Sequence, residues 1–397
     1  MTLPLLNRFS FYRRLPLAWL MLKRHPTRFV TALLGIAASG VLILMQLVIQ
    51  DSLFQSSLSI INKIDADLLL FNKQSVSLIS FMSFPEERLS SVLKSPYVKK
   101  AFPVRFRFLA WRLDGDSKKR LAMAVGINPT QQVFTDKSIN LEQKKLVSRG
   151  NILYDVRSRP EFGNVAKKFK TDIPTYGYAG SQRLKVVGLI SFGPSFGYDA
   201  SMLMNMASIS DFNTTDDYSK IKPIELGVIK LVDGVSPKLV AKTINPTLPP
   251  DMVLMTKSEF QATEQSYWNT SKPIGFVFSF MTIMSLFVGG IMVYQLLHMD
   301  ATFHLPSYAV LMSIGYKRAK LEGIVFAEGI ILSTLAFPAA FICSVTLCRV
   351  ISGFTLMNLN VTFNMASSTY FLLLFMCSTS SLLAMSKIKD ADPADLF

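Results

Sequence analysis

Four long apolar stretches, unevenly spaced along the chain, constrain its fold more than any other feature of the sequence. The first occupies residues 29–49, and the other three, at 274–297, 323–350 and 369–386, lie in the last third of the chain. Each is close to the ~20 apolar residues that a helix needs to cross a bilayer. Residues 50–273 are mainly polar. The sequence therefore predicts a polytopic α-helical membrane protein with four transmembrane helices and one large domain between the first two.

A secretory signal peptide is the alternative interpretation of the first apolar stretch. A basic segment followed by an apolar one is typical of both a signal peptide and a membrane anchor. The apolar run is longer than the roughly 7–15 residues of a signal peptide core, and no small-x-small cleavage site lies between Gln46 and Asn62. These two observations favour a retained span.

The distribution of charge predicts the orientation of the four spans. Residues 1–28 carry six basic and no acidic residues, whereas segment 351–368, between the third and fourth spans, carries no charge. Because basic residues collect in cytoplasmic loops, both termini, segment 298–322 and the tail 387–397 are predicted to be cytoplasmic. Residues 50–273 are then periplasmic, and the protein is placed in the inner membrane.

The net charge of +15 would ordinarily raise nucleic acid as a partner. Residues 51–272, however, carry 30 basic and 21 acidic residues, so most of the surplus lies on the predicted periplasmic side. Anionic lipid headgroups or an acidic protein are better partners for this surplus. Segment 1–28 is predicted to form an amphipathic helix in the membrane interface, with a simple basic topogenic tail as the alternative. Its apolar residues are Leu15, Leu17, Trp19, Leu20 and Leu22.

The domain at 50–273 is predicted to be of α+β type, with a helical stalk at 53–64 after the first span. Alternation predicts a strand at 104–112 with Val104, Phe106, Phe108 and Ala110 on one face. Further strands are expected at 121–126, 184–190 and 227–232, and helices at 86–95 and 236–244. The domain contains no cysteine, so its core, in one or two lobes, must be stable without disulfides.

Thr256 and Glu259 have the spacing of a capping box, which predicts a helix that leads back to the second span. Both spans that border the domain are therefore expected to be mechanically continuous with it.

The sequence offers little catalytic chemistry. The three histidines, His25, His298 and His304, all lie on the predicted cytoplasmic side, and no HExxH, CxxC or GxxxxGK[ST] motif occurs. His298 and His304 are six residues apart, which is poor spacing for a shared metal on a helix. The chain is therefore expected not to be an enzyme and to hold no metal or cofactor, and any energy must come from another chain.

Four residues inside the predicted spans stand out. Glu328 is an intramembrane carboxylate, for which a proton relay is one hypothesis and a structural role near the cytoplasmic boundary, accepting hydrogen bonds or reaching the interface, is the favoured one. Gly289 and Gly290 would permit close helix contact, and Pro338 would kink the third span. These residues are predicted to serve packing rather than binding.

The predicted cytoplasmic segment 298–322 contains a short amphipathic helix. Val310, Leu311 and Ile314 fall at helical spacing, Gly315 is placed to end the helix, and Lys317 and Arg318 follow. A short helix of this kind suits docking into a groove on a soluble partner. An interfacial helix without a partner is the alternative.

The chain resembles the permeases of FtsX/MacB-like (type VII) ABC transporters over essentially its whole length. The region from Tyr294 to Tyr316 is similar to the DevC branch, whose cyanobacterial members export glycolipid. The segments that carry the resemblance are FNKQSVSLISFMSF from Phe71, SKPIGFVFSF from Ser271, VGGIMVYQLL from Val288, HLPSYAVLMSIGY from His304 and GIVFAEGIILS from Gly323. Leu311 and Gly315 match the wider family, whereas Ser307 and Met312 replace its usual acidic and basic residues.

The resemblance implies a homodimeric permease that performs efflux, with glycolipid or another lipid-like molecule as the expected substrate, while ATP is bound by two separate cytoplasmic ATPase subunits. It further implies a periplasmic adaptor protein and a TolC-like outer-membrane channel as partners. The residues expected to couple to the ATPase are Ser307, Val310, Leu311, Ile314, Gly315, Lys317 and Arg318. A ligand-sensing or scaffold membrane protein is the alternative function, and a membrane-bound hydrolase comes third.

Overall fold

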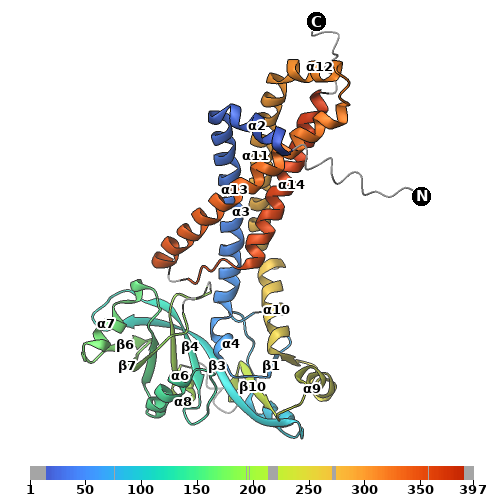
Figure 1. Ribbon diagram of the computed structural model, residues 1–397. Helices are drawn as coiled ribbons and strands as arrows, with labels where there is room; N and C mark the ends of the chain where they lie inside the picture. The colour runs from blue at the N-terminus through green and yellow to red at the C-terminus, as the bar shows by residue number, and fades with distance from the viewer. Residues whose placement is uncertain are drawn as a thin grey trace. The chain divides into compact units, whose positions relative to one another are not determined.

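The computed structural model describes residues 15–75, 77–193, 195, 197–212, 222–270, 274–355 and 357–388. The chain divides into two compact units (Figure 1). The helical unit comprises residues 1–51, 275–354 and 359–397, and the sheet unit comprises residues 52–274 and 355–358.

Helices make up most of the described part of the helical unit (Figure 1). They are α2 (Leu15–Arg24), α3 (Pro26–Ser57), α11 (Ile274–Phe303), α12 (Leu305–Ser313), α13 (Arg318–Thr355) and α14 (Phe363–Ile388). Of these, α3, α11, α13 and α14 are long and apolar enough to cross a membrane, which confirms the four apolar helices predicted. The α-helix predicted at the N-terminus is observed as α2, while residues 1–14 and the end of the tail, residues 389–397, fall outside the described residues.

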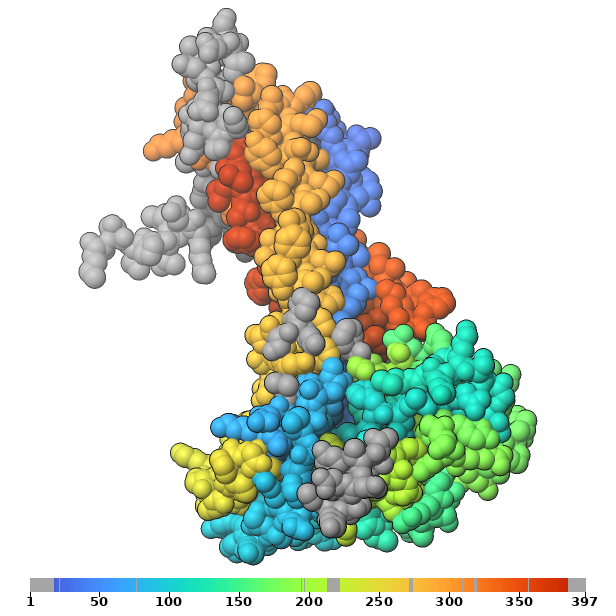
Figure 2. All heavy atoms as spheres, turned by 180° about the vertical axis from the view of Figure 1, so that it is seen from behind, coloured from blue at the N-terminus to red at the C-terminus, as the bar shows by residue number. Residues whose placement is uncertain are grey.

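Apolar side chains from α3, α11, α13 and α14 form the core of the helical unit. Gln46, a polar interruption of α3, is accommodated because its Oε1 accepts a hydrogen bond of 2.9 Å from Thr282 Oγ1 of α11. Such pairing matters because an unpaired amide is costly in apolar surroundings. Figure 2 shows α11 (gold to orange) between α3 (blue) and α14 (red), with much of its own surface uncovered.

The sheet unit is of mixed α and β structure, as predicted. Its strands are β1 (Leu68–Asn72), β2 (Phe84–Pro85), β3 (Val98–Leu113), β4 (Arg120–Ile127), β5 (Asn151–Asp155), β6 (Tyr176–Ala179), β7 (Gln182–Ile190), β8 (Ser201–Asn205), β9 (Pro223–Ile224), β10 (Leu226–Leu231) and β11 (Met252–Thr256). Its α-helices are α4 (Ser59–Lys63), α5 (Leu89–Leu93), α6 (Lys137–Glu142), α7 (Val165–Lys170), α8 (Met206–Ser210), α9 (Pro237–Ile244) and α10 (Lys257–Thr270). Short 3-10 turns are η2 (Glu86–Arg88), η3 (Gln143–Val147), η4 (Pro160–Phe162) and η6 (Asn245–Thr247).

All four predicted strands are present, as β3, β4, β7 and β10. The helix predicted at 86–95 is shorter than expected, because residues 86–88 form the 3-10 turn η2 and the α-helix α5 ends at Leu93. The predicted stalk helix at 53–64 is also interrupted, with α3 ending at Ser57 and α4 beginning at Ser59.

One nine-stranded sheet, in the order β11-β1-β10-β3-β4-β8-β5-β7-β6, organises the sheet unit. Strands β11, β1, β10 and the first half of β3 form an antiparallel part. Helices α5 and α9 cover one face of this part through residues such as Val92 and Val240. On the other face, Ile60 and Ile61 of α4 and Phe260 of α10 join the core.

The remaining strands close into a barrel. Strand β6, at the end of the sheet order, also pairs with β3, between Trp111 and Ala179 and between Leu113 and Gly177. The ring therefore runs β3-β4-β8-β5-β7-β6 and back to β3. Trp111 is 1% exposed in the core of this barrel. A Cβ atom at Gly177 would lie 2.2 Å from Trp111 Cη2, so a residue without a side chain is required there.

The long strand β3 serves both parts of the sheet, and this corrects the predicted alternation. Val104 and Phe106 contribute to the core shared with α4 and α10, as the predicted face requires. Beyond that point the opposite face is buried, since Leu109 and Trp111 enter the barrel core and Ala110 is exposed. Neighbouring residues of a strand point to opposite faces, so one strand can supply two cores on its two sides.

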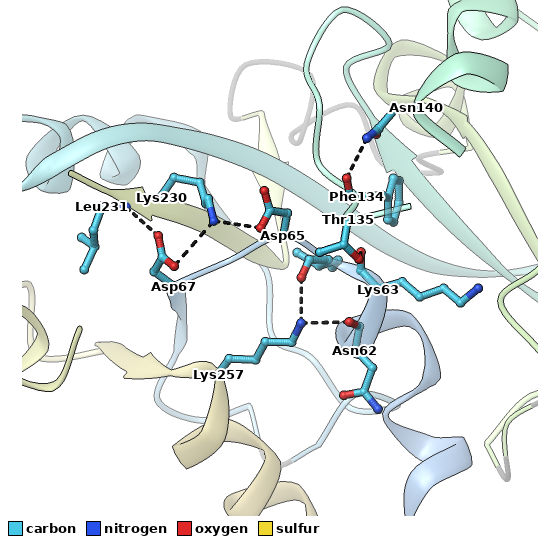
Figure 3. A network of polar contacts seen from close by, with 11 residues as sticks. Asn62, Lys63, Asp65, Asp67, Phe134, Thr135, Asn140, Lys230, Leu231 and Lys257 are labelled. Atoms are coloured by element: carbon cyan, nitrogen blue, oxygen red, sulfur yellow. Dashed lines mark hydrogen bonds and ion pairs between the residues drawn. The ribbon is translucent and has the colours of Figure 1, made fainter. Parts of the chain in front are cut away.

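A network of polar contacts ties the beginning and the end of the sheet unit together (Figure 3). Lys257, the first residue of α10, donates hydrogen bonds to the carbonyls of Asn62 (2.9 Å) and Ile64 (2.8 Å), which end α4. Burial lowers the pKa of Lys257, although the charge of Asp65 acts in the opposite direction. The segment that enters this unit is thus bonded directly to the helix that leaves it.

The predicted capping box at the start of α10 is confirmed. Glu259 Oε2 accepts a hydrogen bond of 2.9 Å from the Thr256 amide, and Thr256 Oγ1 accepts one of 3.2 Å from the Glu259 amide. Residues 271–273, between α10 and α11, fall outside the described residues, so the predicted continuity into the second span stays a prediction.

The stability of the sheet unit is expected to fall as pH rises through about 7, because of Glu264 on α10. Burial raises the pKa of Glu264 to about 7, although hydrogen bonds from Trp268 Nε1 and the Leu78 amide lower it. The folded state therefore keeps a proton that the unfolded state releases near the ordinary pKa of 4.5. This contribution to stability is fully present below pH 4.5 and is lost as pH rises through about 7.

Thermal unfolding of the purified full chain between pH 5 and 8 measures this dependence. Glu264→Gln should make it shallower without removing it, because burial also raises the pKa of Glu225 in the same unit to about 7. Glu161→Gln, at an exposed site in the same unit, should leave it unchanged. An identical pH dependence in Glu264→Gln and the unaltered protein would contradict the assignment.

Candidate docking site on helix α12

Helix α12 connects α11 to α13 and is sharply bounded at both ends. His304 precedes it, and Pro306 occupies its first turn, where the missing amide hydrogen is not needed. At its C-terminal end the Tyr316 amide donates to the Leu311 carbonyl (3.0 Å) and the Gly315 amide to the Met312 carbonyl (2.9 Å). Gly315 has a φ of +98°. This pair of bonds with a left-handed glycine is a Schellman motif, and it confirms that Gly315 ends the helix.

One face of α12 is held against the helices beside it. Tyr308 is buried in a small core with Ala18 of α2 and Leu321, Ile324 and Ala327 of α13. Leu311 and Met312 are partly buried against the same core. Leu311 is predicted to contact an ATPase, but part of its side chain packs against this core and helps to hold α12 in position.

The opposite face of α12 presents an apolar pair to the exterior. Val310 is 49% and Ile314 71% exposed, and their spacing of four residues places them on the same side of the helix. Tyr316 is also exposed, and the Lys320 ammonium lies 5.4 Å from the centre of its ring. Lys317 is exposed as well. The side chains of Ser307 and Arg318 fall outside what the structure describes.

Beneath α12 lies a cluster of buried polar groups that the sequence analysis did not assemble. Asp300 of α11, His304 between the two helices and Tyr308 of α12 follow one another at intervals of four residues, and backbone hydrogen bonds of 3.0 Å join the His304 amide to the Asp300 carbonyl and the Tyr308 amide to the His304 carbonyl. His304 Nε2 lies 3.9 Å from Asp300 Oδ1. Burial lowers the pKa of His304, with Asp300 opposing the shift, and burial together with the charges of Glu328 and Asp300 raises the pKa of Tyr308. The four-residue spacing was the signal available in the sequence.

Glu328 of α13 belongs to the same region and is 1% exposed. Within the described part of the chain, neither its Oε1 nor the Tyr308 hydroxyl has a hydrogen-bond partner. One of the predicted structural roles, in which the Glu328 side chain reaches the interface, requires that side chain to be exposed. The structure buries it instead. Its function stays a prediction.

The small residues predicted for packing lie at helix contacts. A Cβ atom at Gly289 of α11 would lie 2.9 Å from Ser39 Cβ of α3 and 2.8 Å from Met376 Sδ of α14. At Gly290 the carbonyl accepts a hydrogen bond of 2.8 Å from Ser380 Oγ of α14. Pro338 lies inside α13, which is assigned as one helix throughout.

Metal-binding clusters are not found in the described ranges, where no group of three or more histidine, cysteine, aspartate or glutamate residues could hold an ion. What α12 offers chemically is an apolar contact surface on a helix whose orientation is set by Tyr308 and Gly315.

No family model matches the chain, and no curated protein matches it. Among solved structures, the periplasmic region of MacB from Actinobacillus actinomycetemcomitans is 12% identical, with 51% of this chain and 94% of that chain covered at a TM-score of 0.32. The extracellular domain of the ABC-type transporter YknZ from Gram-positive bacteria is 12% identical (48% and 99% covered, TM-score 0.31). A domain of a permease protein from Porphyromonas gingivalis is 11% identical (48% and 88% covered, TM-score 0.29). TM-scores of this size do not establish a common fold.

Proposed function

We propose that this chain is the permease subunit of an ABC exporter and that it passes the motion of a separate cytoplasmic ATPase to its sheet unit. The observation that carries the proposal is the exposed pair Val310 and Ile314 on α12, a short helix between two membrane-length helices. Apolar side chains on a fixed helix are the features that a groove on a soluble partner recognises.

The segments that join the two units support transmission of motion. Helix α3 continues without interruption from Pro26 to Ser57, across the point where the helical unit ends and the sheet unit begins. Within the sheet unit, Lys257 bonds the end of α4 to the start of α10. A movement passed along α3 would therefore reach, by way of α4, the residues that are bonded to Lys257 at the start of α10.

The remaining parts of the proposal follow from the sequence resemblance to DevC-type permeases. The protein would reside in the inner membrane as a homodimer with cytoplasmic termini. Its sheet unit would act on a periplasmic adaptor and a TolC-like outer-membrane channel, and glycolipid or another lipid-like molecule would be the cargo. ATP would be bound by the partner ATPase, and no cofactor is assigned to this chain.

Replacing Val310 and Ile314 together with aspartate is expected to release the ATPase. Two charges on the docking face would have to be desolvated on binding, so we expect at least a tenfold loss of associated ATP hydrolysis, from about 1.4 kcal/mol or more of binding free energy. The tagged full chain is purified from native membranes in mild detergent, and MgATP hydrolysis by the preparation is measured. Since the sequence has no phosphate-binding loop, turnover reports the partner.

Leu239→Asp is the matched control, because Leu239 is an aliphatic residue of comparable exposure on α9 of the sheet unit. It should leave the copurified turnover unchanged. Normal turnover in the Val310→Asp, Ile314→Asp variant would contradict docking on α12. Absence of any ATPase from preparations of the unaltered protein would contradict the permease proposal itself.

A further inference from the structure

A pocket of about 180 Å³ lies beside the first turn of α3, within the helical unit. Leu22 of α2, Phe29 of α3 and Leu297 of α11 are among its apolar walls. Three of its lining residues are ionisable, namely His25, Arg28 and Asp300. A cationic group and a carboxylate thus share one small, partly apolar site.

The pocket continues into an apolar groove. A second cavity of about 200 Å³ shares Thr31, Leu296 and Met299 with the pocket and follows α3 and α11 past Gly35 to Met292. Figure 2 shows these two helices side by side, in blue and in gold to orange. Both helices are of membrane length. A polar pocket that opens into an apolar groove along such helices fits a lipid, with the headgroup in the pocket and the start of an acyl chain in the groove. A free phosphate would occupy the pocket alone and would not need the groove.

Aromatic contacts hold the polar side chains of the pocket in place. The Arg28 guanidinium lies 5.2 Å from the centre of the Phe303 ring, and the His25 ring meets the same ring edge to face at 5.0 Å. Asp300 is 9% exposed. Among the residues that the structure describes, Arg28 Nη1, His25 Nε2 and Asp300 Oδ2 have no hydrogen-bond partner.

We propose that this pocket binds the headgroup of an anionic lipid that also carries hydroxyl groups, with phosphatidylglycerol as the representative probe. The anionic group accepts hydrogen bonds from Arg28 and His25, and a hydroxyl donates to the vacant Oδ2 of Asp300. The acyl chain follows the groove past Gly35. Basic pockets between membrane helices are known to hold such headgroups, and buried polar atoms ordinarily have partners.

The requirement for a hydroxyl separates this site from general attraction between basic residues and anionic lipid. A headgroup with phosphate alone, as in phosphatidic acid, leaves Asp300 without a donor and brings a second negative charge beside its carboxylate. Phosphatidylcholine has no donor and carries a bulky cation beside Arg28. The expected order of retention is therefore phosphatidylglycerol first, with the other two weaker.

Native mass spectrometry of the delipidated full chain in detergent, titrated with each of the three lipids, tests the site. We expect one phosphatidylglycerol per chain. Arg28→Gln should lower its retention about tenfold, the effect of one charge-assisted hydrogen bond. Lys23→Gln removes an equal charge from an exposed position on the neighbouring helix and should change retention less than about twofold.

Two further variants test the groove and the hydroxyl. Gly35→Leu fills the groove, where a Cβ atom would meet only the mobile end of Met292 at 3.2 Å, and it should weaken phosphatidylglycerol retention without altering the headgroup residues. Asp300→Asn should equalise phosphatidylglycerol and phosphatidic acid. Melting curves identify any variant that fails to fold.

Equal losses in Arg28→Gln and Lys23→Gln would overturn the pocket in favour of general electrostatic attraction. Unchanged binding in Gly35→Leu would overturn the position of the acyl chain, and equal retention of phosphatidic acid and phosphatidylglycerol by the unaltered chain would overturn the hydroxyl contact.

Discussion

Replacing Trp111 with alanine is expected to destabilise the sheet unit by about 3–5 kcal/mol. Trp111 is the largest fully buried side chain of the chain's described part, and it fills the barrel between β3 and β6. Gly177, which faces the Trp111 ring, has no side chain that could move into the cavity left by alanine. Hydrogen exchange of the full chain in detergent measures the loss. Amides of β4 and β7 that exchange through unfolding of the barrel should exchange roughly 100-fold faster or more.

Leu121→Ala is the control for Trp111→Ala. Leu121 lies on β4, which pairs with β3, but its side chain is more than half exposed, so exchange in the barrel should change little. Similar exchange rates in the two variants would show that the barrel core is not closed around Trp111.

Gly289→Ala is expected to destabilise the helical unit by about 1–3 kcal/mol, the usual effect of overpacking. The added carbon would lie 2.9 Å from Ser39 Cβ, whose position is set by the backbone of α3, so the two helices would have to separate. Gly290→Ala is a matched control, because its new carbon would find Ser380 Oγ at 3.5 Å, an ordinary contact. Both substitutions raise intrinsic helix propensity equally, so the difference between their melting temperatures isolates the packing.

A glycine exchange between the two helices tests the cause of that difference. Ser39→Gly combined with Gly289→Ala moves the glycine from α11 to α3 and removes the colliding Ser39 side chain, so the melting temperature should recover in part. If the double variant melts no higher than Gly289→Ala alone, the contact between these positions does not limit the packing of α3 on α11.

Features that depend on neighbouring residues could be predicted from the sequence. Hydrophobicity over about 20 residues is a local property, so four apolar helices were predictable. The bonds between Thr256 and Glu259 close within one helical turn, and the left-handed conformation of Gly315 follows from its missing side chain. Strands β3, β4, β7 and β10 were predictable for the same reason, since alternation and flanking turn residues identify them.

Features that depend on contacts between distant segments could not be predicted in this way. The barrel closes because residues 111–113 pair with residues 177–179, and no local pattern specifies that partner. The same closure explains the change of buried face along β3, where Ala110 is exposed and Trp111 buried.

Helix α12 and its surroundings illustrate both what the sequence could predict and what it could not. By itself the sequence determined that residues near 305–315 form a short helix with apolar residues and a glycine end. Val310, Leu311 and Ile314 are all apolar, however, so periodicity alone could not distinguish the packed residues from the exposed ones. The tertiary structure decided this, because Tyr308 and Leu311 pack against α13 and leave Val310 and Ile314 uncovered. Likewise, only the approach of α3 to α11 brought Arg28 and Asp300 into one pocket, since the side chains that meet in space are selected by packing between helices and not by their separation along the chain.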